Sequence, residues 1–247
     1  AQEIAFSYGI TTVDDAGLGQ STIELIDSLQ QKNELKIRIY AMVSATQKNL
    51  DYYINKGIVK TNRLHVRSFK IYGDGALGSR GAAMRTSYSD RHNHFGALIY
   101  SPERYREMAQ QIAASEYQMN THAIGDSANT WILKTYEEFL KGKQNRRWRI
   151  EHAQIISKDD FYLFENVLPS IQPTHATSDM YWAEDRIGKD RMEGAYAYKD
   201  LLNIYGKVAL GTDFPVEQVN PFLTIYEATA RKDVEGYPEG GFQIKNV

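Results

Sequence analysis

The stretch VRSFKIYGD, residues 66–74, is a largely apolar run that carries a lysine, Lys70, near its end. Three later stretches place a metal-ligating side chain at the end of a similar run: MNTHAIGD with His122, RIEHAQ with His152 and VALGTDFPV with Asp213. In a (β/α)8 barrel the groups that perform chemistry lie at the carboxyl ends of successive strands, where distant parts of the sequence converge. A hydrolytic metal centre is the interpretation that uses all four side chains.

Short apolar or β-branched runs alternate along the chain with longer amphipathic stretches, which is the pattern of a parallel sheet with crossover helices. Seven strands are predicted, over residues 10–15, 36–45, 66–74, 117–122, 147–152, 168–173 and 207–213. Helices are expected from Ser21, Ala45, Ser101, Asn129 and Ser157, and residues 1–8 resemble the end of another. Eight strands close a barrel. The predicted fold class is therefore an α/β, (β/α)8 TIM-barrel-like domain that is incomplete, with strands 2–8 present and strand 1 absent.

Length and composition limit the classes of protein to consider. The 247 residues fit one α/β barrel domain, and no repeat or linker divides them, so residues 1–247 are expected to form one partial domain. The net charge of −2 gives no reason to expect a nucleic-acid partner. The chain has no cysteine, so a metal would be held by histidine, carboxylate or modified lysine.

The chain opens in AQEIAFSYG, with neither an initiator methionine nor a charged and then apolar leader. This start predicts a fragment or an ordered portion of a longer protein. No apolar run approaches the ~20 residues that span a bilayer, so no membrane association is expected. A cytoplasmic location is favoured, although the compartment stays undetermined.

Five segments in order, FKIYGDGALGSRGAAM, THAIGDSAN, RIEHAQ, IQPTHATSDMYWAEDRIG and LGTDFPVEQVNPF, resemble the amidohydrolase superfamily. Within it they are similar to amidohydrolase family 3, the group that includes the N-substituted formamide deformylases. The resemblance implies a distorted barrel with one or two divalent metals, zinc being the expected ion. It also implies two features that this sequence lacks, a His-x-His pair on the first strand and a small β-sandwich built from both termini.

Residue by residue, the resemblance implies that Lys70 is a carboxylated, bridging ligand and that His122 and His152 are ligands. Asp213 would be both a ligand and the proton shuttle. Without the first-strand histidines, residues 1–247 alone are expected to bind zinc weakly or not at all and to hydrolyse nothing.

The chemistry explains why these residue types would be needed. A metal ion lowers the pKa of bound water to about 7 and polarises the carbonyl under attack. Imidazole and oxygen ligands suit zinc. A lysine ammonium cannot ligate, so Lys70 makes sense as a ligand only when carbamylated. Asp213 can take the proton from water and return it to the leaving nitrogen.

Each candidate also has a purely structural interpretation. Lys70 could mark where a strand reaches solvent, His122 and His152 could be hydrogen-bonded core or loop histidines, and Asp213 could be a turn former. The joint occurrence at four strand ends favours the ligand interpretation. Five further residues are predicted to bind substrate, namely His175, Asp74, Arg80, Trp182 and Phe214. His175 could instead be a loop histidine, and Asp74 and Arg80 could only order their loops.

Two motifs are interpreted as decoys. His92 and His94 have the His-x-His spacing, but they lie in a polar stretch with no preceding strand and are predicted to sit in a surface loop. Residues 73–78 match the G-x-G-x-x-G dinucleotide fingerprint. No long helix follows them, so the glycines more plausibly allow close approach of the loop backbone to substrate or metal.

The favoured function is hydrolysis of a C–N bond in an amide, N-substituted formamide or cyclic amide by metal-bound hydroxide. The alternative is an inactive barrel fragment that binds a small molecule or a partner, and a third hypothesis is a nicotinamide- or flavin-dependent enzyme. The expected partner is a small-molecule substrate. A homodimer stays open, because a missing strand leaves unpaired sheet edges.

Overall fold

The computed structural model of the protein describes residues 1–243, and the chain divides into two compact units. The first unit comprises residues 1–71 and 102–120. The second comprises residues 72–101 and the chain from residue 121 onward. The boundaries between the units fall within two strands, residues 64–72 and 118–123.

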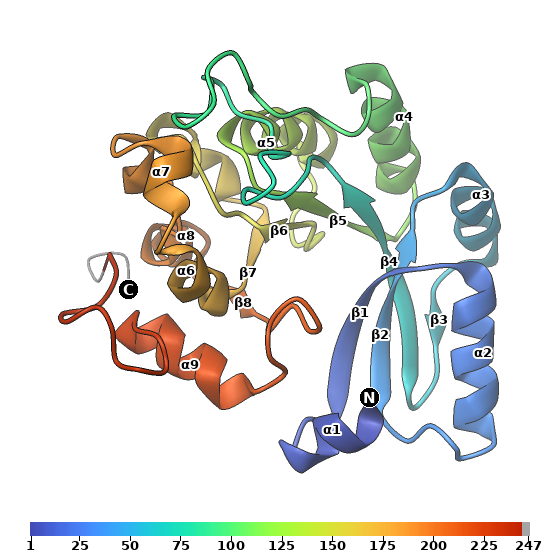
Figure 1. The fold of residues 1–247 in the computed structure, drawn as a ribbon. Coiled ribbons are helices and arrows are strands. Elements are labelled where there is room, and N and C mark those ends of the chain that lie inside the picture. Colours follow the sequence, from blue (N-terminus) through green and yellow to red (C-terminus); the bar gives the residue numbers. More distant parts are fainter. Residues whose placement is uncertain (244–247) are drawn as a thin grey trace. The chain divides into compact units, whose positions relative to one another are not determined.

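The first unit contains three parallel strands in the order β1 (Thr12–Leu18), β2 (Arg38–Ser44) and β4 (Leu64–Tyr72). The short strand β3 (Val59–Lys60) pairs antiparallel with β4. Its helices are α1 (Gln2–Ser7), α2 (Gln20–Gln31), α3 (Gln47–Lys56) and α4 (Pro102–Ala113). Figure 1 shows β1, β2 and β4 side by side, with α2 and α3 on one side of them.

Local sequence signals explain where these elements begin and end. Thr46 caps α3, since its hydroxyl accepts a hydrogen bond from the backbone N–H of Asn49 at 3.3 Å, and Gly57 ends the helix with a φ of 80°. In β2 the consecutive residues Ala41, Met42 and Val43 are all buried, as is usual for a strand that is covered on both faces of a parallel sheet.

The second unit contains the strands β5 (Gln118–Ala123, whose last three residues belong to this unit), β6 (Arg149–His152), β7 (Leu168–Ile171) and β8 (Ala209–Leu210). Their order is β5-β6-β7-β8, and the pairs β6–β7 and β7–β8 are parallel. The helical elements are α5 (Asp126–Leu140), η1 (Lys158–Phe164), α6 (Pro173–Asp179), α7 (Ala183–Ile187), η2 (Arg191–Gly194), α8 (Tyr198–Tyr205) and α9 (Pro221–Ala230).

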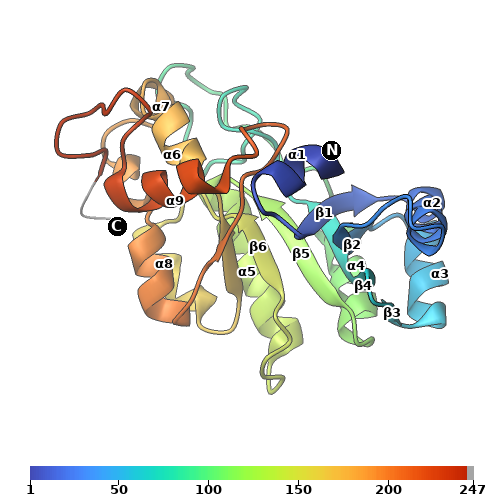
Figure 2. The ribbon, with the colours of Figure 1, turned by 90° about the horizontal axis from the view of Figure 1, so that it is seen from below.

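Packing in the second unit fixes the strand ends. Helix α8 packs against β7 and η1, and α6 packs against α9, beside which it lies in Figure 2. Tyr136 of α5 meets the fully buried Trp148 edge-on, with ring centroids 4.8 Å apart, and its hydroxyl lies 2.7 Å from the Thr121 hydroxyl on β5. An aromatic pair of this kind stabilises by roughly 0.5–1.5 kcal/mol beyond its buried area. It ties α5 to the strands that carry His122 and His152.

The predicted α/β class is confirmed, and a strand stands at each of the seven predicted places within residues 1–243. β8 is shorter than expected, because only Ala209 and Leu210 pair with β7. The helix predicted from Asn129 begins earlier, at Asp126, and the one predicted from Ser157 is a 3-10 helix. The four helices α6 to α9 were not anticipated. Apart from β3, residues 1–243 hold no additional strand that could build a small β-sandwich.

The single domain expected over residues 1–247 stays a prediction.

Residues 1–243 include no helix of the length and apolarity that crossing a membrane would require.

Candidate metal centre

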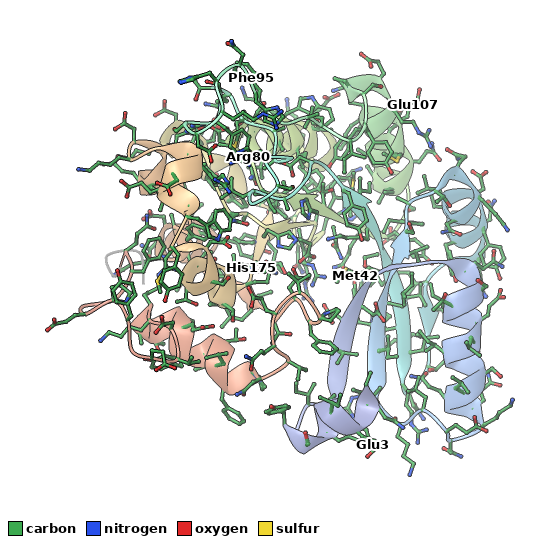
Figure 3. All side chains as sticks on the ribbon, viewed as in Figure 1. Glu3, Met42, Arg80, Phe95, Glu107 and His175 are labelled. Carbon is green, nitrogen blue, oxygen red and sulfur yellow. The ribbon has the colours of Figure 1, made fainter. Side chains whose placement is uncertain are left out.

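Three side chains of the second unit gather where a divalent ion could bind. His152, His175 and Asp213 each offer one ligand atom, and these atoms all lie within 4.8 Å of one another. His152 is the last residue of β6, His175 is carried by α6 (Figure 3), and Asp213 follows the end of β8. Two imidazoles, once deprotonated, and a carboxylate are a donor set that suits zinc and related divalent ions. The residues therefore fit a divalent metal ion.

The histidine rings continue as a short series. The rings of His122 and His152 have centroids 4.5 Å apart and meet edge-on. Those of His152 and His175 are 5.8 Å apart. His122, which lies on β5, is thus next to the three-residue cluster, and the structure brings together three of the four predicted ligands with His175.

The backbone at this cluster is unusual. His152 has a φ of 76°, Ala153 of 45° and Asp213 of 57°, all in the left-handed region that residues other than glycine rarely adopt. Such conformations cost on the order of 1–3 kcal/mol each and persist where the surroundings enforce them, often at functional sites. Here they turn two ligand-bearing residues at the ends of their strands toward a common point.

His175 is held at both ring nitrogens. Its Nε2 lies 3.2 Å from Oδ2 of Asp213, and its Nδ1 lies 3.2 Å from Oε1 of Glu217. Burial opposes protonation of this ring, but the hydrogen bonds to Asp213 and Glu217 outweigh it and raise the pKa of His175 to about 9. The sequence analysis assigned His175 to substrate binding, and the geometry also makes it a candidate ligand.

Asp74 is almost fully buried, at 1% exposure. Its carboxylate accepts hydrogen bonds from the backbone N–H groups of Ala83 at 2.9 Å, Ile124 at 3.0 Å and Gly125 at 2.8 Å, and lies 3.5 Å from Nε2 of His122. Burial raises the pKa of Asp74 to about 7, against the effect of these hydrogen bonds. Its position matches the alternative interpretation of the sequence, in which Asp74 orders the surrounding loops.

Lys70 lies on β4, opposite Ser44 of β2, and is 5% exposed. It belongs to the first unit, whereas the histidines and Asp213 belong to the second. Its roles as a ligand and as a carboxylated lysine stay predictions.

Arg80, one of the predicted substrate-binding residues, is engaged within the protein. Its guanidinium forms two hydrogen bonds to Asp90, at 2.9 and 2.7 Å, and Asp90 also pairs with Arg186. The Arg186 guanidinium lies 5.6 Å from the centroid of the Trp182 ring, another predicted residue. This network joins the loop after β4 to α7, so Arg80 also orders its loop.

Phe214, the remaining predicted residue, directly follows Asp213 and is 49% exposed. Of the two motifs interpreted as decoys, the His-x-His pair of His92 and His94 lies in a loop without regular secondary structure, as predicted. Gly73 allows close backbone approach, since its N–H donates to the His122 carbonyl at 2.8 Å, and a Cβ here would lie 2.8 Å from that oxygen.

Sequence reasoning missed Glu217 and Ser178, which contact each other beside His175. Glu217 lies four residues after Asp213 in an irregular segment without periodicity. Its partners come from α6, a short helix that the sequence did not reveal. The proximity of His175 and Asp213 was hidden for the same reason.

Comparison with known proteins places this geometry in context. A model of the amidohydrolase family matches residues 4–246. The protein LONG AFTER FAR-RED 3 of Arabidopsis thaliana is 31% identical over 250 residues, covering 94% of this chain and 42% of that protein. "Putative amidohydrolase YtcJ" of Bacillus subtilis is 34% identical over 170 residues, covering 67% of this chain and 31% of that protein.

Among solved structures, an uncharacterized metal-dependent hydrolase from Pyrococcus horikoshii superposes with a TM-score of 0.84 at 28% identity, covering 99% of this chain and 51% of that one. The chain thus spans about half or less of the length of the proteins it matches. A family match over nearly all of its residues, together with a parallel α/β fold that forms part of a barrel, leads to one conclusion: the chain belongs to the amidohydrolase family.

Proposed function

We propose that this protein is a metal-dependent hydrolase that cleaves a C–N bond in an amide, an N-substituted formamide or a cyclic amide. The observation that carries the proposal is the convergence of His152, His175 and Asp213, whose ligand atoms lie within 4.8 Å of one another. A divalent metal, most simply zinc, would supply a water that is acidic enough to attack at neutral pH and would polarise the substrate carbonyl.

The chain's own residues define the proton chemistry. The Asp213 side chain is 35% exposed, so water and substrate can reach it, and its Oδ2 faces Nε2 of His175. A carboxylate in this position can accept a proton from the attacking water and deliver it to the leaving nitrogen. In the metal-free protein, Nε2 of His175 lies 3.2 Å from Oδ2 of Asp213 and holds that carboxylate in place.

The finer assignments extend this proposal. The deformylase-like substrate class comes from the motifs quoted above, and the carboxylation of Lys70 would add an oxygen donor to the site. The chain spans about half or less of the length of its relatives. The hydrolytic activity is therefore proposed for the whole protein to which these residues would belong. We also propose a small molecule as the partner, with no nucleic acid and no membrane.

A second candidate function, binding without turnover, has one observation in its favour. His92-Asn93-His94 is the sequence's His-x-His pair, and it lies in a loop rather than on a strand of the sheet. A chain without that pair on a strand has fewer metal donors. Such a chain could bind a small molecule or a partner without hydrolysing it.

Metal titration of the longest available form of the protein tests the metal proposal directly. Zinc affinity is measured by chelator competition for the unchanged chain and for His152→Ala, His175→Ala and Asp213→Ala. Loss of an outer-shell partner costs roughly 10–100-fold in affinity, so loss of a ligand is expected to cost at least about as much. Glu137→Ala, on the exposed side of α5, is the matched control. Equal zinc affinity in all five proteins would contradict a site at this cluster.

Hydrolysis is tested with a panel of N-substituted formamides, linear amides and cyclic amides, using the longest available form of the protein. Metal-dependent turnover of one class supports the hydrolase proposal. Stoichiometric metal without turnover of any class supports the binding function instead.

A further inference from the structure

Glu217 has a geometry that neither the motifs nor the family match assigns. Its Oε1 receives two hydrogen-bond partners at once, Nδ1 of His175 at 3.2 Å and the Ser178 hydroxyl at 2.7 Å. His175 and Ser178 stand three residues apart on α6, a spacing that puts two side chains on the same side of a helix. A single carboxylate oxygen of Glu217 therefore binds two side chains on the same side of α6.

The same turn supplies both partners of the His175 ring. The N–H of Val216 donates to the Asp213 carbonyl at 2.8 Å, and the N–H of Glu217 approaches the same oxygen at 3.4 Å. This turn places the Asp213 carboxylate next to Nε2 of His175 and the Glu217 carboxylate next to Nδ1 of the same ring. The ring is thus fixed at two opposite atoms by residues whose separation the backbone turn determines.

Ring orientation matters here, because the side-chain torsion that rotates a histidine ring has broad preferences and does not select one orientation by itself. The orientation must come from the partners of the ring. Ser178 strengthens this arrangement, since its hydroxyl donates to the same Glu217 oxygen and keeps the carboxylate from rotating away. Glu217 is also largely covered, with 19% of its side chain exposed, so water competes weakly for these bonds.

We propose that Glu217 is a positioning residue, which holds the His175 ring by Nδ1 and thereby directs Nε2 toward Asp213. The inference rests on the proposed function only for the metal that Nε2 would meet. A hydrogen bond from the second nitrogen of a metal-ligating histidine to a carboxylate is a known way of fixing its orientation and tautomer. Glu217 itself touches neither metal nor substrate in this role.

Two readouts test the proposal, and one of them needs no metal. The first is the orientation of the His175 ring in crystals of the metal-free chain, for the unchanged protein and for Glu217→Ala, Glu217→Gln and Ser178→Ala. The second is the zinc dissociation constant of the same proteins, with Glu137→Ala as the exposed control.

In Glu217→Ala we expect the ring to rotate away from Asp213 and the zinc affinity to fall by about 10–100-fold. Glu217→Gln retains an oxygen that can accept from Nδ1, so it should restore the ring orientation and most of the affinity. Ser178→Ala should give a smaller loss in the same direction. If Glu217→Ala does not fold, the glutamine and Ser178 variants still decide the outcome.

An unchanged ring in Glu217→Ala overturns the inference, whatever the zinc affinity. The inference is also overturned if Glu217→Gln folds but its His175 ring rotates. Where Glu217→Ala cannot be studied, it is overturned if Ser178→Ala changes neither the orientation of the His175 ring nor the zinc dissociation constant. If the unchanged chain binds no zinc but the ring rotates in Glu217→Ala, the positioning role stands and the proposed metal function fails. The two failures are therefore distinguishable.

Discussion

Replacing Asp74 should reveal how much of the second unit's stability depends on one buried carboxylate. Asp74→Ala leaves the backbone N–H groups of Ala83, Ile124 and Gly125 without their acceptor. Each unsatisfied buried donor costs roughly 1–3 kcal/mol, so the variant should lose about 3–9 kcal/mol unless water enters. Small domains have only about 5–15 kcal/mol in total. The alanine variant should therefore be close to unfolded.

Asp74→Asn separates the hydrogen bonds from one another. An amide oxygen in the place of Oδ2 can still accept from Ala83 and Gly125, but the amide nitrogen would face the N–H of Ile124. One lost bond should cost about 1–3 kcal/mol. The expected order of stability is therefore unchanged chain, then asparagine, then alanine.

The assay is urea unfolding of the metal-free chain, with amide exchange at Ile124 and Gly125 as a local readout. Asp185→Asn, exposed on α7, is the control and should change stability by less than about 0.5 kcal/mol. If Asp74→Ala remained within about 1 kcal/mol of the unchanged chain, less than the cost of one unsatisfied donor, Asp74 would not order these loops.

Three further predictions concern other parts of the second unit. Asp213→Asn in the intact protein should retain most of its metal, measured per chain after dialysis, while turnover falls by roughly 10² or more; full activity would exclude the proton-shuttle role. Gly73→Ala would place a Cβ 2.4 Å from the Ile132 Cδ1 atom and should lower the free energy of unfolding by about 1–3 kcal/mol, measured by urea titration. Burial raises the pKa of Asp179 from 3.8 to about 6, against hydrogen bonds from Tyr196 and Gln154. The native state therefore binds more protons than the unfolded state between these values, so the Asp179 contribution to stability falls as pH rises through this window. Unfolding of Asp179→Asn from pH 3.5 to 7 should lack that component, and an unchanged pH profile would contradict it.

The sequence predicted the strands well because burial leaves a local signal. Buried runs such as the one around Met42 are apolar over several residues, and the side chains at their ends follow directly. His122 and His152 therefore lie where a strand-end argument puts them. No comparable signal exists for a contact between a short helix and an irregular segment, as between His175 of α6 and Asp213.

Helix α9 shows why the later helices were missed. Its apolar residues Phe222 and Ile225 are 66% and 54% exposed, whereas Thr224 and Glu227 are buried against α6. Glu227 accepts a hydrogen bond from the Thr177 hydroxyl at 2.8 Å. An amphipathic pattern predicts that the apolar face is the covered one. Here specific polar contacts decide the orientation, and they cannot be inferred from periodicity.

The left-handed backbone at His152 and Asp213 sets stability against activity at the same two positions. Glycine or asparagine would adopt these angles at lower cost than most residues. A laboratory selection for thermal stability alone would therefore tend to replace His152 and Asp213. The selected variants would be more stable but would lack two of the proposed metal ligands. In a set of natural variants, histidine and aspartate retained at these positions would indicate selection for the chemistry, since folding alone gives no reason to keep them.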